Sequence, residues 1–236
     1  MALEISDELR DAENATNPDP RSEGFSTIEA GFARPYTLQD RSDIISSIVL
    51  NPEVPSSIRV QFDTARNLYL YAWFVYRFHT VAEQHALAAL EFALREWFIS
   101  AGLVERDAEY IPGLKHFLKD AVTRGLIANE RLSFRQAWAV DLARNRLRQF
   151  QVDEMTRLNA SEMTFIDSEI RPTKEDLEHD WIGVFIEALP DIRNTYAHGT
   201  DHLHHTVLRT FHVVADLVNQ LFAQSPVSYV DLKKSS

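Results

Sequence analysis

The sequence predicts an all-α protein: one helical bundle with long helices and a polar N-terminal arm. Its 236 residues include seven glycines and nine prolines, few enough helix breakers to leave room for long helices. Apolar residues recur at spacings of three and four, and no stretch alternates convincingly between apolar and polar residues. We expect a polar, partly disordered arm at 1–39, a helical domain at 40–224 and a tail at 225–236.

Charge and composition exclude several classes of protein. The net charge of −11 argues against a protein that coats nucleic acid nonspecifically. The charge is concentrated in residues 1–23 (net −5) and 153–180 (net −6), so the rest of the chain is neutral overall and can carry a local basic surface. The absence of cysteine excludes disulfide scaffolds, thiolate zinc sites and cysteine nucleophiles.

Neither a membrane span nor an export signal is expected. The most apolar stretch, Leu68–Val75, is followed by Arg77 and is far shorter than the ~18–20 residues that cross a bilayer. The N-terminus is acidic and lacks the basic start and apolar run of a secretory signal. We therefore expect a cytoplasmic protein that does not bind a membrane.

The N-terminal elements are short. Residues 14–24 are polar and contain Pro18, Pro20 and Gly24, which favours a loop or disordered arm, with room for a short helix before it. Isoleucine and valine at helical spacing then predict a short amphipathic helix over 40–50, which ends before two further prolines.

Longer helices follow. Residues 58–99 contain no glycine or proline, so we expect either one very long helix or two helices broken near His79–Thr80. Gly102 ends this region. The spacing then predicts helices over 113–127 and over 133–150, the second capped by a serine.

The last third of the chain begins with an acidic stretch, 151–172, for which we expect irregular structure. A helix is predicted over 175–189, and Pro190 either interrupts it or starts a new turn. A final helix with a continuous apolar stripe is predicted over 202–223.

The segment between those two helices contains an arginine, an amide and a histidine suited to phosphodiester cleavage. The Arg193 guanidinium can hold a phosphate through two hydrogen bonds. His198 titrates near neutral pH and can take or give a proton, while Asn194 can orient either side chain or the substrate. The spacing alone is weak, but the string Arg-Asn-x-x-Ala-His is expected by chance only on the order of 0.003 times in such a chain.

Residues 193–199 (Arg-Asn-Thr-Tyr-Ala-His-Gly) resemble the Arg-x4–6-His signature of the HEPN superfamily, all-α domains found in toxin–antitoxin, abortive-infection and CRISPR-associated ribonucleases. The resemblance covers the motif, its place before a terminal helix and the helical character of 58–223. It implies a HEPN-like helical bundle, a metal-independent endoribonuclease without cofactor, and a homodimer whose motifs face each other. Arg193 and His198 would be the catalytic pair, and Asn194 the polar residue after the arginine. Many such proteins are non-catalytic binding modules.

The geometry of a helix also favours a dimer. Five residues rotate by ~500°, which leaves Arg193 and His198 ~140° apart around the axis, so one continuous helix does not easily bring both to one phosphate. Either the segment bends at its flanking proline or glycine, or a second copy completes the site. We expect a homodimer with 190–205 and parts of 58–100 in its interface, weakened by acid because histidines would meet there.

A histidine cluster follows the motif: Asp201, His202, His204 and His205. On an unbroken helix His198, His202 and His205 would share one face with a metal-ligand spacing, but Gly199 interrupts the helix and no HExxH motif is present. We expect no metal site. His202 and His205 either line the same cleft as His198 or are solvated.

Basic residues form a third feature. Arg131, Arg135, Arg144 and Arg148 include two i, i+4 pairs, are joined by Arg146 and alternate with aromatic residues, so they can hold an RNA backbone and stack bases. The alternative is a solvated helix face that pairs with the acidic segment 153–180.

These observations favour an RNA endonuclease of a toxin or phage-defence type, with RNA, a second copy and an antitoxin or defence protein as partners. The alternative is a non-catalytic HEPN-like RNA-binding or protein-interaction module, an antitoxin or regulator. In a purely structural role, Arg193 would pair with carboxylates such as Asp191 and His198 would end a helix favourably.

Overall fold

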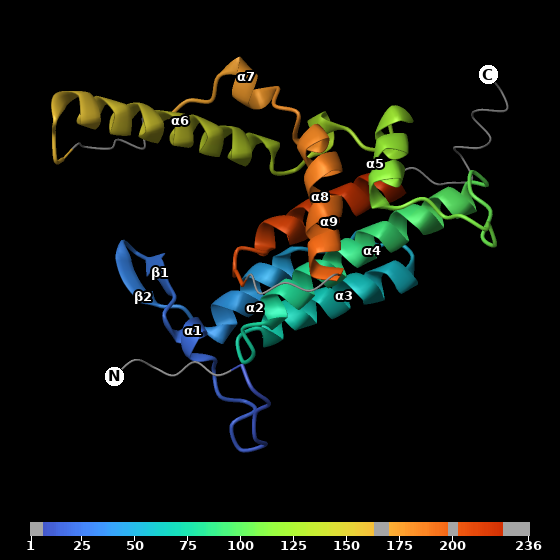
Figure 1. Cartoon of the computed structure of the whole chain (residues 1–236), viewed down its shortest axis with the longest axis horizontal. Helices are drawn as coiled ribbons and strands as arrows, with labels where there is room; N and C mark the ends of the chain where they lie inside the picture. Colours follow the sequence, from blue (N-terminus) through green and yellow to red (C-terminus); the bar gives the residue numbers. More distant parts are fainter. Residues whose placement is uncertain (1–6, 163–169, 198–202, 224–236) are drawn as a thin grey trace. The chain divides into compact units, whose positions relative to one another are not determined.

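The computed structural model describes residues 7–162, 170–197 and 203–223, and helices dominate this part of the chain (Figure 1). The predicted all-α class is confirmed in its helical content. The chain divides into two compact units. Unit 1 comprises Met1–Ile127 and Ile186–Ser236, and unit 2 comprises Ala128–Phe185.

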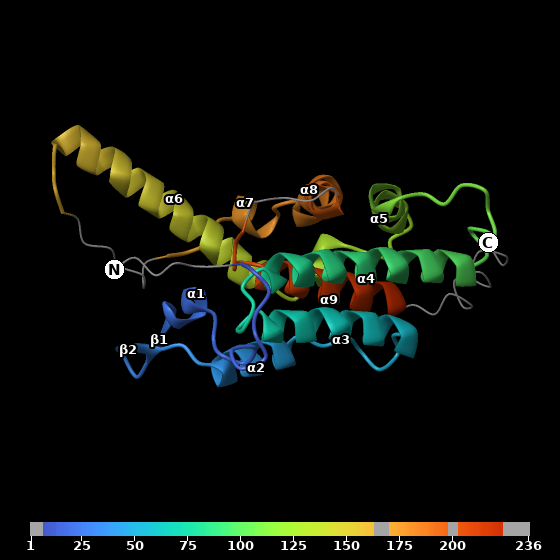
Figure 2. The same ribbon diagram turned by 60° about the horizontal axis from the view of Figure 1, so that its bottom comes forward.

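Unit 1 is built on three helices that lie side by side in both views (Figures 1 and 2). The central helix, α4, packs against both α3 and α9, while α2 contacts α3 and α5 contacts α4. Fully buried aromatic rings fill the space between them, and Phe62 and Phe211 have ring centroids 5.8 Å apart. The bounds are α1 Pro20–Glu23, α2 Leu38–Ser47, α3 Ser56–Tyr71, α4 Phe78–Ser100, α5 Leu114–Thr123 and α9 Leu208–Phe222.

The apolar region 58–99 forms two helices, one of the two alternatives expected, and the break precedes the expected position. It falls at residues 72–77, where Asp19 from the N-terminal arm binds the connection. The Asp19 amide donates to the carbonyl of Trp73 (2.9 Å), and its carboxylate accepts from the Tyr76 amide (3.3 Å). The arm thus satisfies backbone groups that the break leaves without helical partners.

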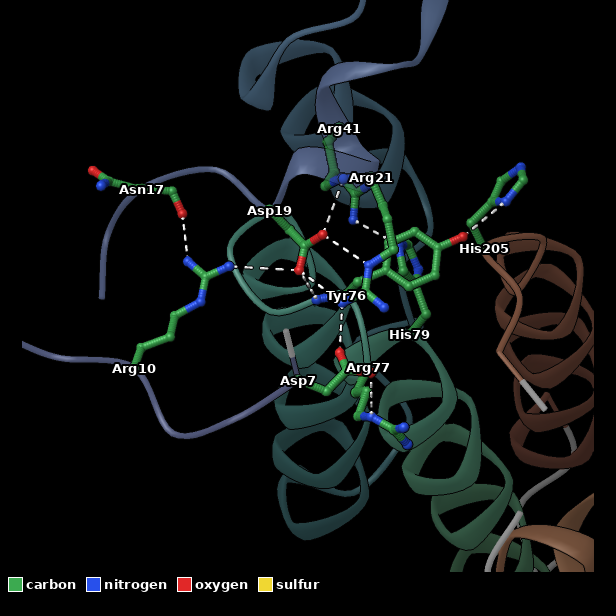
Figure 3. A network of polar contacts seen from close by, with 10 residues as sticks. All are labelled: Asp7, Arg10, Asn17, Asp19, Arg21, Arg41, Tyr76, Arg77, His79 and His205. Atoms are coloured by element: carbon green, nitrogen blue, oxygen red, sulfur yellow. Dashed lines mark hydrogen bonds and ion pairs between the residues drawn. The ribbon is translucent and has the colours of Figure 1, made fainter. Parts of the chain in front are cut away.

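Part of the N-terminal arm is held by ion pairs (Figure 3). The buried carboxylate of Asp19 pairs with Arg21 (2.9 Å) and Arg10 (3.5 Å). Asp7 pairs with Arg21 (2.6 Å) and with Arg77 at the start of α4 (3.0 Å). The polar composition that suggested a loose arm therefore supplies the contacts that fix residues 7–24 to the helices.

An antiparallel hairpin, β1 (Ser26–Glu29) and β2 (Phe32–Pro35), follows α1 and was not predicted. Its two turn residues, Ala30 and Gly31, both have positive φ (50° and 84°), as a type I′ turn requires. Alanine seldom adopts this conformation, and the usual sequence signal for such a turn is Asn-Gly or Asp-Gly. The Ala-Gly pair therefore gave no indication of a hairpin.

Several predicted helix boundaries need correction. Helix α2 begins earlier than expected, because Thr37 and Asp40 form a capping box at its N-terminus. The last helix, predicted from His202, begins at Leu208, and the described residues 203–207 are not helical. Residues 151–158, expected to be irregular, continue a helix.

Unit 2 contains a short 3-10 turn η1 (Asn129–Arg131), the long helix α6 (Arg135–Leu158) and α7 (Lys174–Leu177). Its apolar cluster includes Trp138 and Trp181, whose rings meet edge-on at 4.7 Å. Arg146 binds the buried carboxylate of Asp176 through two hydrogen bonds of 2.7 Å. This ion pair joins α6, which carries the clustered arginines, to the acidic segment 153–180. Such pairing is the alternative to RNA binding that the charge pattern indicated.

Helix α8 (Trp181–Ala197) begins in unit 2 and ends in unit 1. Pro190 lies inside it, so this proline neither ends the helix nor starts a new one. Within the described ranges, none of the helices combines the length and hydropathy needed to cross a bilayer.

Candidate functional site

Arg193 lies near the C-terminal end of α8, and its side chain is about half exposed. Its Nη2 is 3.1 Å from Oε2 of Glu91 on α4, and side-chain exposures are 40% and 25% for the two residues. Its Nη1 donates to Oδ1 of the adjacent Asn194 (3.3 Å). The sequence leaves open whether Asn194 orients the arginine, the histidine or the substrate, and its contact here is with the arginine. Glu91 was not anticipated from the sequence.

Arg193 and Asn194 line an open cleft of about 290 Å³ in unit 1. The opposite wall is the N-terminal turn of α5 and the loop before it. A neighbouring hollow of about 350 Å³ shares Glu91 and Arg193 with the first and continues along α4. The remaining residues of the first cleft are Tyr110, Gly113, Leu114, Lys115, His116 and Pro190. The cleft therefore gathers polar and cationic side chains from three elements.

His116 is a second histidine of this region that sequence reasoning missed. It is exposed at the start of α5 and lines the same cleft as Arg193. No short motif surrounds His116. It is far from Arg193 along the chain, so the sequence does not indicate that the two side chains line one cleft. Only the packing of α5 against α4 brings it to the cleft.

Both cations beside the cleft have a carboxylate partner. Arg193 pairs with Glu91, and Lys115 on α5 pairs with Glu187 on α8. These pairs are partly exposed and so contribute little to stability. A phosphate entering the cleft would have to compete with Glu91 for Arg193, whose guanidinium can bind it through two hydrogen bonds.

Behind the motif lies a buried polar cluster around Glu83 of α4, which is 3% exposed. The Tyr196 hydroxyl donates to Glu83 Oε2 at 2.6 Å, and Nε2 of His204 lies 3.2 Å from the same oxygen and 2.6 Å from the hydroxyl. Thr210 of α9 donates to the other carboxylate oxygen. Burial, and then the hydrogen bond to Glu83, raise the pKa of Tyr196. The cluster fixes the end of α8 to both α4 and α9.

Of the other predicted residues, His198 and His202 lie outside the described residues. His205 is described, and it does not line the Arg193 cleft. Its Nδ1 lies 3.3 Å from the Tyr76 hydroxyl, and its ring is 4.7 Å from that of Phe25. His205 therefore belongs to a different pocket of unit 1.

The predicted RNA-binding arginines 131, 135, 144 and 148 belong to unit 2, and Arg193 belongs to unit 1. Arg135 Nε donates to the carbonyl of Leu177 (2.6 Å), and Arg144 pairs with Asp141 one turn earlier (2.5 Å). Part of this positive charge is thus engaged within unit 2.

The described ranges contain no group of three or more histidine, aspartate or glutamate side chains that could hold a metal ion. Comparison of the chain with models of protein families, with curated proteins and with solved structures gave no match.

Proposed function

We propose that this protein is a metal-independent endoribonuclease, of a toxin or phage-defence type, that uses Arg193 and His198. The observation that carries the proposal is the half-exposed Arg193 beside Asn194 in an open cleft that also holds His116. The motif arginine is accessible to a ligand rather than buried.

In the proposed reaction the RNA supplies its own nucleophile. The 2′-oxygen attacks the adjacent phosphorus, the bond from phosphorus to the 5′-oxygen breaks, and the products are a 2′,3′-cyclic phosphate and a 5′-hydroxyl. One group must accept the proton of the 2′-hydroxyl, and another must deliver a proton to the leaving 5′-oxygen. We assign His198 to one of these transfers and His116 to the other, with Arg193 stabilising the charge that develops on the phosphate oxygens.

The direct test is incubation of purified protein with total RNA in the presence of EDTA. Cleavage should persist with the chelator, and it should be lost in Arg193→Ala and His198→Ala. Arg106→Ala and His212→Ala are matched controls, because neither residue lines the cleft. Cleavage by His198→Ala at the parental rate would show that His198 does not transfer a proton in the reaction.

The proposed homodimer can be tested by complementation. If Arg193 of one copy acts with His198 of the other, heterodimers of Arg193→Ala and His198→Ala contain one intact site. A random mixture should then recover roughly a quarter of the parental activity. If both residues act within one copy, the mixture stays inactive. Light scattering at neutral pH checks that the dimer exists.

A non-catalytic RNA-binding or protein-interaction module is the second candidate, and the Glu91–Arg193 ion pair favours it. In such a module the arginine is a structural partner of the carboxylate. Binding of RNA without cleavage, unchanged in His198→Ala, would support this function over the first.

A further inference from the structure

Unit 1 contains another pocket, of about 430 Å³, that shares no lining residue with the Arg193 cleft. Its walls come from the hairpin region, α2, α3 and the start of α9, four segments distant in the sequence. We call it the Arg41 pocket. Its apolar and aromatic lining consists of Phe25, Tyr36, Ile44, Tyr69 and Leu208.

One charged side chain of this lining, Arg41 of α2, is buried, with 2% of its surface exposed. Its guanidinium lies over the rings of Tyr69 (4.9 Å) and Trp73 (5.7 Å). Nη1 donates to the carbonyl of Tyr69 (3.1 Å) and lies 3.3 Å from Nε2 of His79. Nε is buried and has no hydrogen-bond partner among the residues that the structure describes.

No carboxylate of the described residues pairs with Arg41. The nearby network in Figure 3 does not supply one, because Asp19 is engaged by Arg10, Arg21 and the Tyr76 amide. The polar contacts that Arg41 makes within these ranges, to the Tyr69 carbonyl and to His79, are to neutral groups. The positive charge of Arg41 is therefore not balanced within the described part of the chain.

The neutral partner of Arg41 stays neutral. Burial, and then the adjacent Arg41, lower the pKa of His79 to about 3, so this ring carries no charge near neutral pH and accepts from the arginine through Nε2. An arginine cannot relieve its own burial by losing a proton. Burying one unpaired charge carries a large desolvation penalty, so buried arginines usually have an anionic partner.

The start of α9 adds to the positive potential. Thr206 and Leu208 line the pocket at the N-terminus of this 15-residue helix, where the first amide groups have no partner within the helix. Helix N-termini and unpaired guanidinium groups both favour a negatively charged ligand. The aromatic and aliphatic walls favour an apolar body on the same ligand.

We propose that the Arg41 pocket binds a small organic anion. Its carboxylate or phosphate group contacts the Arg41 guanidinium and the start of α9, and its apolar or aromatic body packs against Phe25, Tyr36 and Ile44. The site is independent of the proposed ribonuclease, since it shares no residue with the Arg193 cleft.

The test measures binding of matched probes to the full chain by isothermal titration and by thermal shift. Benzoate and phenyl phosphate should bind and raise the melting temperature, whereas neutral benzamide and inorganic phosphate should bind at least about tenfold more weakly. The stronger of the two aromatic anions identifies the headgroup. Absence of binding by both at about 10 mM would overturn the proposal.

Two variants link binding to the pocket. Arg41→Gln removes the charge and should weaken binding of the better anion by at least about tenfold. Because this variant can fail to fold, Ile44→Trp provides a second test: Ile44 is 38% exposed, and the larger ring fills the pocket while the charge of Arg41 remains. Circular dichroism confirms the fold of each variant. Arg59→Gln, at an exposed arginine of α3 outside the pocket lining, is the control and should bind as the parent does. Undiminished binding by folded Ile44→Trp would place the ligand elsewhere and refute the proposal.

Discussion

The hydroxyl of Tyr196, in the middle of the Arg-x4-His motif, lies 2.6 Å from the buried carboxylate of Glu83 on α4. Tyr196 and Arg193 belong to the same helix, α8, so this hydrogen bond positions the helix end that carries Arg193. The motif thus contains an anchor that faces inward and an arginine that faces the cleft.

Loss of this anchor should destabilise unit 1. Tyr196→Phe removes the hydroxyl and leaves Glu83 with Thr210 and His204, so we expect a loss of about 1–3 kcal/mol in the free energy of unfolding. Denaturant unfolding measures it. Tyr71→Phe, at a tyrosine that is 55% exposed, is the matched control and should be nearly neutral. Equal effects of the two substitutions would show that the hydrogen bond contributes nothing.

Glu91 should restrain the binding of phosphate by Arg193. Glu91→Gln removes the competing charge while keeping the size of the side chain, so RNA affinity should rise, by a few-fold for a partly exposed pair. Filter binding at low salt measures the change. Glu96→Gln, which alters another carboxylate of α4 that pairs with Arg106, is the control. An affinity for RNA that falls in Glu91→Gln would mean that the carboxylate positions the arginine for binding.

His116 should affect catalysis without affecting the fold. Because its side chain is exposed, His116→Ala should leave the unfolding free energy nearly unchanged. Removal of a group that transfers a proton should lower the cleavage rate by roughly 10²–10⁴-fold. Single-turnover cleavage compares this variant with His212→Ala. A rate within about twofold of the parent would exclude His116 from proton transfer.

Stability should fall as the pH is lowered below about 6.5. The pKa of His79 is lowered to about 3 by burial and by Arg41, so between these values the unfolded chain binds a proton that the folded chain does not. The free energy of unfolding should decrease with falling pH, at a limiting slope of about 1.4 kcal/mol per pH unit for this group.

Denaturant titrations between about pH 7 and about pH 5 measure this slope above the range in which most carboxylates titrate. His79→Gln keeps an acceptor for Arg41 and should flatten the dependence. His212→Gln is the comparison variant, because burial lowers the pKa of His212 in the folded chain as well. An unchanged slope in His79→Gln would show that His79 is not the group responsible.

The long amphipathic helices could be predicted from the sequence, because the spacing of apolar residues along each segment is visible without knowing what the segment packs against. The apolar stripe at 207–221 predicted α9, and its N-terminal boundary was missed because residues 202–207 also fit a helical spacing. Acidic composition was a poor guide to structure at 151–158. There α6 continues, and Gln149 donates to Asp153 one turn later while Arg157 pairs with Glu154.

The site could be predicted only where it is local. Arg193 and Asn194 are adjacent, so their contact follows from the sequence. Glu83, Glu91 and His116 reach the site through the packing of α4, α5 and α8, and nothing near them in the sequence marks them. Arg41 is a similar case, because an arginine on a short polar helix gives no sign of burial.

The distribution of tryptophan provides an optical means of following each unit. Trp73 and Trp97 belong to unit 1, and Trp138 and Trp181 belong to unit 2, which accounts for all four in the chain. Replacing one pair leaves fluorescence from the other unit alone. The edge-on contact of Trp138 with Trp181 makes emission from unit 2 sensitive to the opening of its small apolar cluster, at the place where α8 begins. Denaturation curves from the two variants then report whether the units that share this helix unfold in one transition or in two.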